Sequence, residues 1–175
     1  MDERQKTAQQ TIDRWARTQP DAIRPAVMTS REILEEIKLA HHNYTERAKE
    51  FAFDPDQQYK IIYDACVVGS NALLHAYGYR ASGAGGHRAT VTGAVGILRT
   101  LGNEDAAKDA QYISSVLAVK RHEAAYERLH AIDEDDIAFA HSVAQAVVPA
   151  LCAEAARRVD LDLNREGVVF APPSE

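Results

Sequence analysis

Cysteine is scarce in this chain, with only Cys66 and Cys152 among 175 residues. Neither belongs to a C-x-x-C motif, and two cysteines cannot form the framework of a disulfide-stabilised domain. Both lie in apolar segments, which predicts two buried free thiols. This cysteine usage suits a reducing compartment, and we expect a cytoplasmic protein.

Long hydrophobic runs are also missing. The first ten residues, MDERQKTAQQ, contain no apolar region of the kind found in signal peptides. Two uncharged runs, Ala65–Tyr79 and Ile137–Ala153, have 15 and 17 residues. Because a membrane span needs about 20 apolar residues, both runs are predicted to be buried core helices, and no membrane association is expected.

Positive charge is not in excess. The chain has 20 lysines and arginines against 26 aspartates and glutamates, a net charge of −6. This balance excludes a non-specific nucleic-acid coat and a binder of anionic membranes. The length fits a single domain, and 46% hydrophobic and 26% charged residues are ordinary for a soluble globular protein.

Helical periodicity is what the sequence does contain. Thr29 and Glu32 have the spacing of a capping box, which predicts a helix start. An apolar stripe then recurs at intervals of three and four residues: Ile33, Ile37, Ala40, Tyr44, Ala48 and Phe51. Asp54 and Pro55 predict the start of a second helix. This helix is apolar on several faces up to Tyr77, so we expect it at the centre of a bundle.

Three further helices are predicted over residues 88–101, 104–130 and 134–159, the last with a kink or break at Pro149. No segment alternates with a period of two for long enough to predict a sheet. We therefore expect an all-α fold, an up-and-down bundle of about five main helices over residues 29–160.

The two ends of the chain lie outside this bundle. Residues 1–28 form a lead segment with a short helix over residues 7–18, and residues 161–175 form a polar tail. Trp15 lies on the lead helix. It packs on the domain or docks on a second subunit, and the sequence leaves both positions open.

Negative charge is absent from one long stretch. Residues 65–103 contain no Asp or Glu and include a glycine-rich loop over residues 79–88. This acid-free loop ahead of a helix predicts an anion site, with Arg80, His87 and Arg88 as ligand-binding residues. The alternative is a plain connection with solvated arginines. The glycines match neither the phosphate-binding P-loop nor the dinucleotide fingerprint.

A second polar group, Lys120–Glu123, follows an apolar run on one predicted helix. His122 and Tyr126 are four residues apart and share a face, and Arg121 projects about 100° away from His122. An arginine can bind a phosphate while a histidine and a tyrosine relay a proton. The alternative is a structural polar network at a seam of the bundle.

Metal ligands do not gather in the sequence. Glu127 and His130 have the E-x-x-H spacing of carboxylate-bundle metal sites, but no second such pair exists. His41 and His42 point about 100° apart on a helix, which does not suit chelation. We expect neither a metal nor a cofactor.

Together, the segments HAYGYRASGAGGHRATV (His75–Val91) and KRHEAAYE (Lys120–Glu127) resemble the HEPN superfamily, particularly its small stand-alone bacterial members. The resemblance covers residues 29–160. It implies a helical bundle that usually pairs into a homodimer. Many members are RNases in toxin–antitoxin or phage-defence systems, often with a nucleotidyltransferase-like partner protein.

The family's active pattern is an arginine followed four to six residues later by a histidine. Here Arg121-His122 matches its beginning, but Tyr126 stands at the closing position, which argues against RNA cleavage. Arg80 and His87 have the correct spacing but lie in the loop. The resemblance thus implies a degenerate site that binds a nucleotide or RNA phosphate.

In this interpretation Arg121 and Arg88 bind the phosphate, and His122, Tyr126 and His87 shape the site. Two alternatives stay open. One is an active metal-independent RNase that uses Arg121 with His122, or Arg80 with His87. The other is a non-enzymatic scaffold for dimerisation or partner binding.

Overall fold

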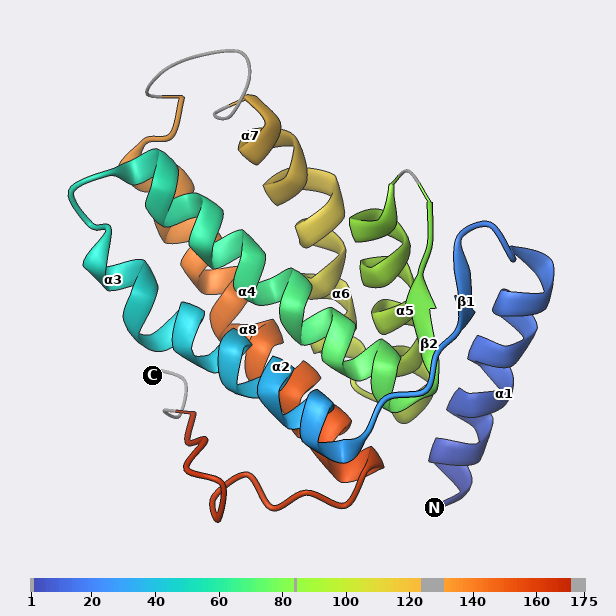
Figure 1. Ribbon diagram of the computed structural model, residues 1–175. Helices are drawn as coiled ribbons and strands as arrows, with labels where there is room; N and C mark the ends of the chain where they lie inside the picture. The colour runs from blue at the N-terminus through green and yellow to red at the C-terminus, as the bar shows by residue number, and fades with distance from the viewer. Residues whose placement is uncertain (1, 84, 124–130, 171–175) are drawn as a thin grey trace.

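The structure is a computed structural model that describes residues 2–83, 85–123 and 131–170. It is mostly helical, with one small ribbon of two strands (Figure 1). This confirms the predicted all-α class. The α-helices are α1 (Glu3–Thr18), α2 (Ser30–His42), α3 (Ala48–Glu50), α4 (Pro55–Ala76), α5 (Gly86–Leu101), α6 (Glu104–Tyr112), α7 (Ala118–His122) and α8 (Glu134–Arg158).

The predicted starts of α2 and α4 are confirmed by their caps. The Thr29 hydroxyl accepts a hydrogen bond from the backbone N–H of Glu32, whose carboxylate accepts one from the backbone N–H of Thr29. The Asp54 carboxylate accepts from the backbone N–H of Gln57, and Pro55 occupies the first turn of α4. These caps satisfy N–H groups that lack partners inside a helix.

α4 packs against α2, α5 and α8, so other helices cover several of its faces. Cys66 on α4 and Cys152 on α8 are buried and free, which confirms the prediction from cysteine usage. Burial raises the pKa of the Cys66 thiol to about 12 and also raises the pKa of the Cys152 thiol. Both thiols therefore stay protonated and unreactive at neutral pH.

α8 runs from Glu134 to Arg158 without a break at Pro149, which lies inside the helix. By length and composition, α8 is long and apolar enough to cross a membrane, and no other helix in the described part of the chain is. In this fold its buried residues, including Val147 and Leu151, belong to the hydrophobic core, and the helix packs against α4. A core helix satisfies the same criterion.

The two-stranded ribbon differs from the prediction that no sheet forms. β1 (Ile23–Pro25) pairs antiparallel with β2 (Tyr79–Ala81), and Arg24 lies opposite Arg80. Three residues are too few for an alternating pattern to be visible in the sequence. The two strands also come from distant segments, so only the tertiary fold brings them together. The loop predicted at residues 79–88 therefore begins as a strand.

α1 packs against α5 at the edge of the bundle (Figure 1). Ile12 is buried, and Trp15 is partly buried against the core. A Cβ atom on Gly93 of α5 would lie 2.8 Å from Cζ3 of Trp15. The missing side chain at Gly93 thus admits the indole ring. Of the two positions that the sequence left open for Trp15, the structure shows packing on the domain.

Two π-helical segments interrupt the long helices. η1 (Asn43–Arg47) joins α2 to α3, and η2 (Ile113–Leu117) joins α6 to α7. A π turn holds one extra residue, so the side chains that follow are rotated by about 100° relative to a continuous α-helix. Such segments are frequent at functional sites. Here η1 ends at Arg47, and η2 precedes Arg121.

Candidate functional site

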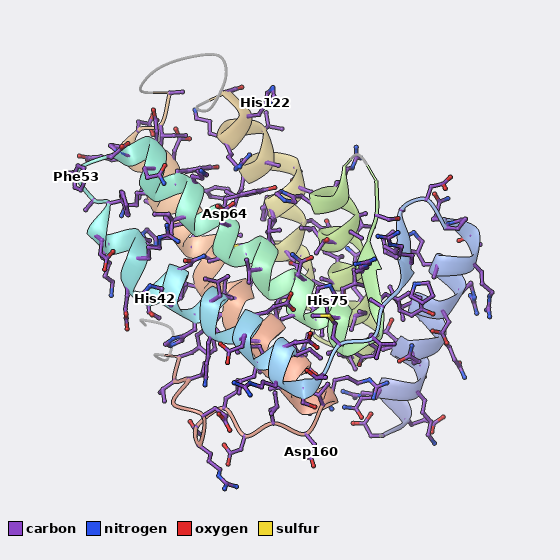
Figure 2. The ribbon with its side chains drawn as sticks, viewed as in Figure 1. His42, Phe53, Asp64, His75, His122 and Asp160 are labelled. Carbon is purple, nitrogen blue, oxygen red and sulfur yellow. The ribbon has the colours of Figure 1, made fainter. Side chains whose placement is uncertain are left out.

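Polar side chains from three helices meet at Tyr63 and Asp64 in the middle of α4, where Figure 2 labels Asp64. The guanidinium of Arg121, from α7, lies over the Tyr63 ring, with its carbon 5.3 Å from the ring centroid. The Tyr63 hydroxyl is hydrogen-bonded to Nδ1 of His87, from α5, at 3.2 Å. Tyr63 thus connects two residues from distant parts of the sequence. We call Tyr63, Asp64, His87 and Arg121 the Tyr63 cluster.

Positive charge surrounds the carboxylate of Asp64. Nε of Arg121 lies 3.9 Å from Oδ1 of Asp64. Burial raises the pKa of Asp64, while the positive charges of Arg121, Lys60, His87 and Arg47 act to lower this pKa. Three permanent cations and one imidazole therefore act electrostatically on a single carboxylate, and Arg121 lies at ion-pair distance from it. This excess of positive charge favours a further anion at the cluster.

The side chain of Arg121 is incompletely satisfied. Its Nε atom is buried and has no hydrogen-bond partner among the described residues. The 3.9 Å separation from Asp64 is an ion-pair distance and exceeds the length of a hydrogen bond. A buried donor without an acceptor is destabilising. An anion oxygen bound beside Arg121 would supply this acceptor.

The Tyr63–His87 pair can position protons. Burial raises the pKa of the Tyr63 hydroxyl, so this group stays protonated and can donate at neutral pH. When it donates to Nδ1 of a neutral His87, the proton of the imidazole lies on Nε2. His87 is exposed in the first turn of α5, which contains no acidic residue. Unpaired N–H groups at a helix start favour a nearby anion.

The other predicted site residues lie elsewhere. His122 is exposed at the end of α7, and Figure 2 shows it away from Asp64. Arg80 is exposed on β2, and Arg88 is exposed in the first turn of α5. Tyr126 lies outside the described residues. The structure thus brings Arg121 and His87 together, each from a different predicted pair.

Sequence reasoning missed Tyr63 and Asp64, although one signal was available. Asp64 is the only acidic residue between positions 57 and 103, and it lies in a helix that the sequence predicts to be apolar on several faces. A lone carboxylate in a core helix indicates a special environment, because burial of a charge requires a partner. The identity of that partner, Arg121, depends on how α7 packs against α4.

No group of three or more histidine, cysteine, aspartate or glutamate side chains that could hold a metal ion is found in residues 2–83, 85–123 and 131–170. The half-motif Glu127 and His130 lies outside these ranges. The Tyr63 cluster itself contains a tyrosine, a carboxylate, a histidine and an arginine.

Comparison with known proteins identifies no relative. No protein-family model matches the chain, and neither curated proteins nor solved structures give a significant match.

Proposed function

We propose that this chain is a HEPN-like helical bundle that binds a phosphate group of a nucleotide or an RNA at the Tyr63 cluster. The observation that supports this most strongly is that Arg121 and His87 both contact Tyr63. Each of the two segments that resemble the HEPN superfamily contributes one of these residues. A homodimer in a toxin–antitoxin or defence setting belongs to the same proposal.

The residues of the cluster suit a phosphate in different ways. Arg121 offers charge-assisted hydrogen bonds, and its unpaired Nε gains an acceptor when the phosphate binds. His87 offers a donor beside the N-terminus of α5. Lys60 and Arg47 add long-range attraction. Asp64 opposes the ligand, and its raised pKa reflects the cost of keeping this carboxylate charged at a half-buried position.

Arg121→Gln tests the binding proposal. We expect the affinity for a fluorescein-labelled RNA oligonucleotide at low salt to fall about tenfold, because a charged hydrogen-bond donor is lost. Fluorescence anisotropy measures the dissociation constant, and unlabelled ATP serves as a competitor. Arg165→Gln, at an exposed position in the C-terminal segment, removes the same charge as a matched control. Equal affinities for wild type and Arg121→Gln would refute the proposal.

A second candidate function is metal-independent RNA cleavage, and the contact of both a histidine and an arginine with Tyr63 favours it. In the other tautomer, in which Nδ1 of His87 donates to the Tyr63 oxygen, Nε2 is free to take the proton of a ribose 2′-hydroxyl, and the freed oxygen would attack the adjacent phosphorus. The bond from phosphorus to the 5′-oxygen then breaks, that oxygen takes up a proton from water, and the imidazolium of His87 returns its proton to the solvent. Arg121 would stabilise the negative charge that develops on the phosphate oxygens.

End-labelled cellular RNA, incubated at low salt with EDTA, tests this second function. If the chain is an RNase, wild type cleaves the RNA, and Arg121→Ala and His87→Ala each lose at least about a hundredfold in rate while remaining folded by circular dichroism. Intact RNA in every lane, together with salt-sensitive binding by wild type, would exclude cleavage and support binding as the function of the cluster.

A further inference from the structure

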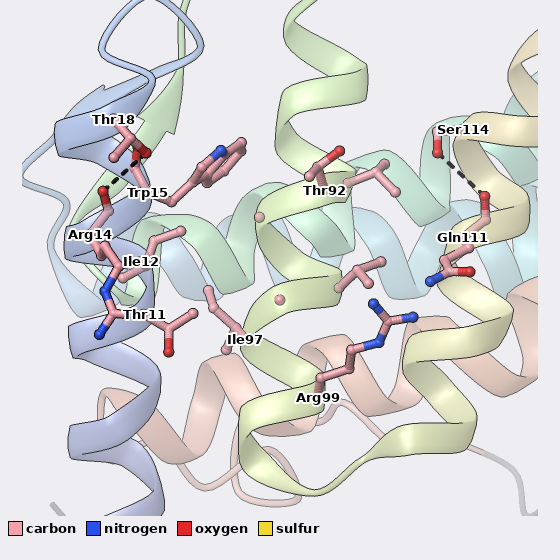
Figure 3. A pocket seen from close by; sticks show the side chains of 14 residues that line it. Thr11, Ile12, Arg14, Trp15, Thr18, Thr92, Ile97, Arg99, Gln111 and Ser114 are labelled. Atoms are coloured by element: carbon pink, nitrogen blue, oxygen red, sulfur yellow. Dashed lines mark hydrogen bonds between the residues drawn. The ribbon is translucent and has the colours of Figure 1, made fainter.

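A groove of about 570 Å³ runs along the outer face of α5, on the side of the molecule where α1 packs (Figure 3). Trp15 and Ile12 of α1 form one wall. Gln111 of α6 and Ser114 of η2 form the opposite wall, and α5 forms the floor. This volume lies within the range of small-molecule sites, about 300–1,000 Å³.

Two glycines of α5, Gly93 and Gly96, line the floor of the groove and leave it without side chains at those positions. Gly93 is required by packing, since a Cβ atom there would lie 2.8 Å from Trp15 and 3.0 Å from Leu74. Packing does not require glycine at position 96, because no atom lies within 4 Å of where a Cβ atom of Gly96 would be. Glycine inside a helix is less stable than alanine. The open space at Gly96 is therefore a feature that neither packing nor helix formation explains.

The groove presents an apolar surface even where its residues are polar. Each hydroxyl that lines it donates to a carbonyl of its own helix, and Figure 3 shows two of these bonds. The residues concerned are Thr11, Thr18, Thr92 and Ser114. With their protons engaged, these hydroxyls do not donate to a ligand. A ligand that needs hydrogen-bond donors from these hydroxyls is therefore disfavoured.

The charged side chains that line the groove are all positive. Arg14 and Arg99 line it, and no carboxylate does. Nε of Arg99 lies 4.0 Å from Glu104, an exposed pair of the kind that contributes little. Arg14 has no side-chain ion pair or hydrogen bond within the described part of the chain. In a chain with a net charge of −6, this groove combines an apolar surface with free positive charge.

We propose that the α5 groove binds a small amphiphile with an aliphatic body and a single anionic headgroup, a carboxylate or a phosphate. The aliphatic body lies over Gly96 and against the indole of Trp15, and an arginine at the groove pairs with the headgroup. This site is separate from the Tyr63 cluster, since the two share no residue.

Trp15 provides a direct test, because it is the only tryptophan in the chain. Titration of the full chain with decanoate or decyl phosphate, below micelle-forming concentrations, should change its fluorescence in a saturable way. A trimethylammonium amphiphile with the same chain should bind at least about tenfold more weakly, because its charge has the wrong sign. Equal affinity for both charges would overturn the proposal.

Gly96→Phe should abolish the response by filling the open space, while circular dichroism and the melting temperature show an intact fold. Ala146→Phe, on the exposed side of α8, adds the same ring elsewhere and should bind like wild type. Arg14→Gln or Arg99→Gln should weaken binding of the anion about tenfold, and Arg165→Gln should not. Unchanged affinity in Gly96→Phe, or a preference for phosphatidylglycerol vesicles over monomeric amphiphile, would contradict a small-molecule groove.

Discussion

Gly93→Leu is expected to separate α1 from α5 at a cost of about 2–3 kcal/mol in the free energy of unfolding. The Cβ atom alone would lie 2.8 Å from the rigid indole of Trp15 and 3.0 Å from Leu74, which is fully buried. Urea denaturation gives the loss of stability, and a red shift of Trp15 fluorescence reports its exposure to water.

Gly96→Ala, one turn further along α5, is the matched control. Nothing lies within 4 Å of the added methyl group, so only the helix preference changes, and stability should rise by about 0.5–1 kcal/mol. The two glycines should thus respond with opposite signs. A Gly93→Leu variant as stable as wild type, with unshifted fluorescence, would show that α1 does not pack on α5 through this position.

Asp64→Asn is expected to strengthen binding of a phosphate at the Tyr63 cluster by about 30-fold. The Asp64 carboxylate lies 3.9 Å from Nε of Arg121 and would repel the ligand that this arginine holds. A charge pair near a protein surface is worth about 4 kcal/mol at 4 Å, and partial exposure reduces this to about 2 kcal/mol. Anisotropy titration of wild type and variant with the same labelled RNA measures the difference.

The pH dependence of this difference follows from the raised pKa of Asp64. At neutral pH the carboxylate is charged in wild type, so the full difference in RNA affinity between wild type and Asp64→Asn is present. As the pH falls through the raised pKa, at values above the ordinary 3.8, Asp64 takes up a proton and the gap closes.

The free energy of unfolding should show the same pH dependence, with Asp64→Asn more stable than wild type at neutral pH. The folded chain binds the Asp64 proton more tightly than the unfolded chain, so the cost of this residue is present at neutral pH and disappears as the pH falls. Removal of the carboxylate by Asp64→Asn abolishes this contribution. Weaker binding by Asp64→Asn at neutral pH would mean that the carboxylate supports the ligand, and the electrostatic account of the cluster would be wrong.

The helices were predictable from the sequence because their signals are local. Thr29 and Glu32 cap α2 within one turn, and Asp54 and Pro55 do the same for α4. The apolar stripe that begins at Ile33 likewise needs only neighbours on one helix. The β1–β2 ribbon was not predictable, because its three-residue strands become visible only when the fold pairs residues 23–25 with residues 79–81.

The candidate site was predictable in part. Arg121 and His87 were recognised as residues suited to a phosphate, but each was assigned to a different neighbour. Their closeness depends on the packing of α7 and α5 against α4, and the π segment η2 rotates Arg121 relative to a continuous helix. A prediction of side-chain directions that assumes 3.6 residues per turn does not include that rotation. Tyr63, which connects the two, looked like an ordinary core residue.

The most direct test of the account is a double-mutant cycle on the Tyr63 cluster. The dissociation constant for labelled RNA is measured for wild type, Arg121→Gln, His87→Gln and the variant with both changes. If the two side chains bind one phosphate, the loss in the double variant is smaller than the sum of the single losses by more than about 0.5 kcal/mol. Single losses that add within that margin would show that Arg121 and His87 act independently, and would contradict a shared phosphate site.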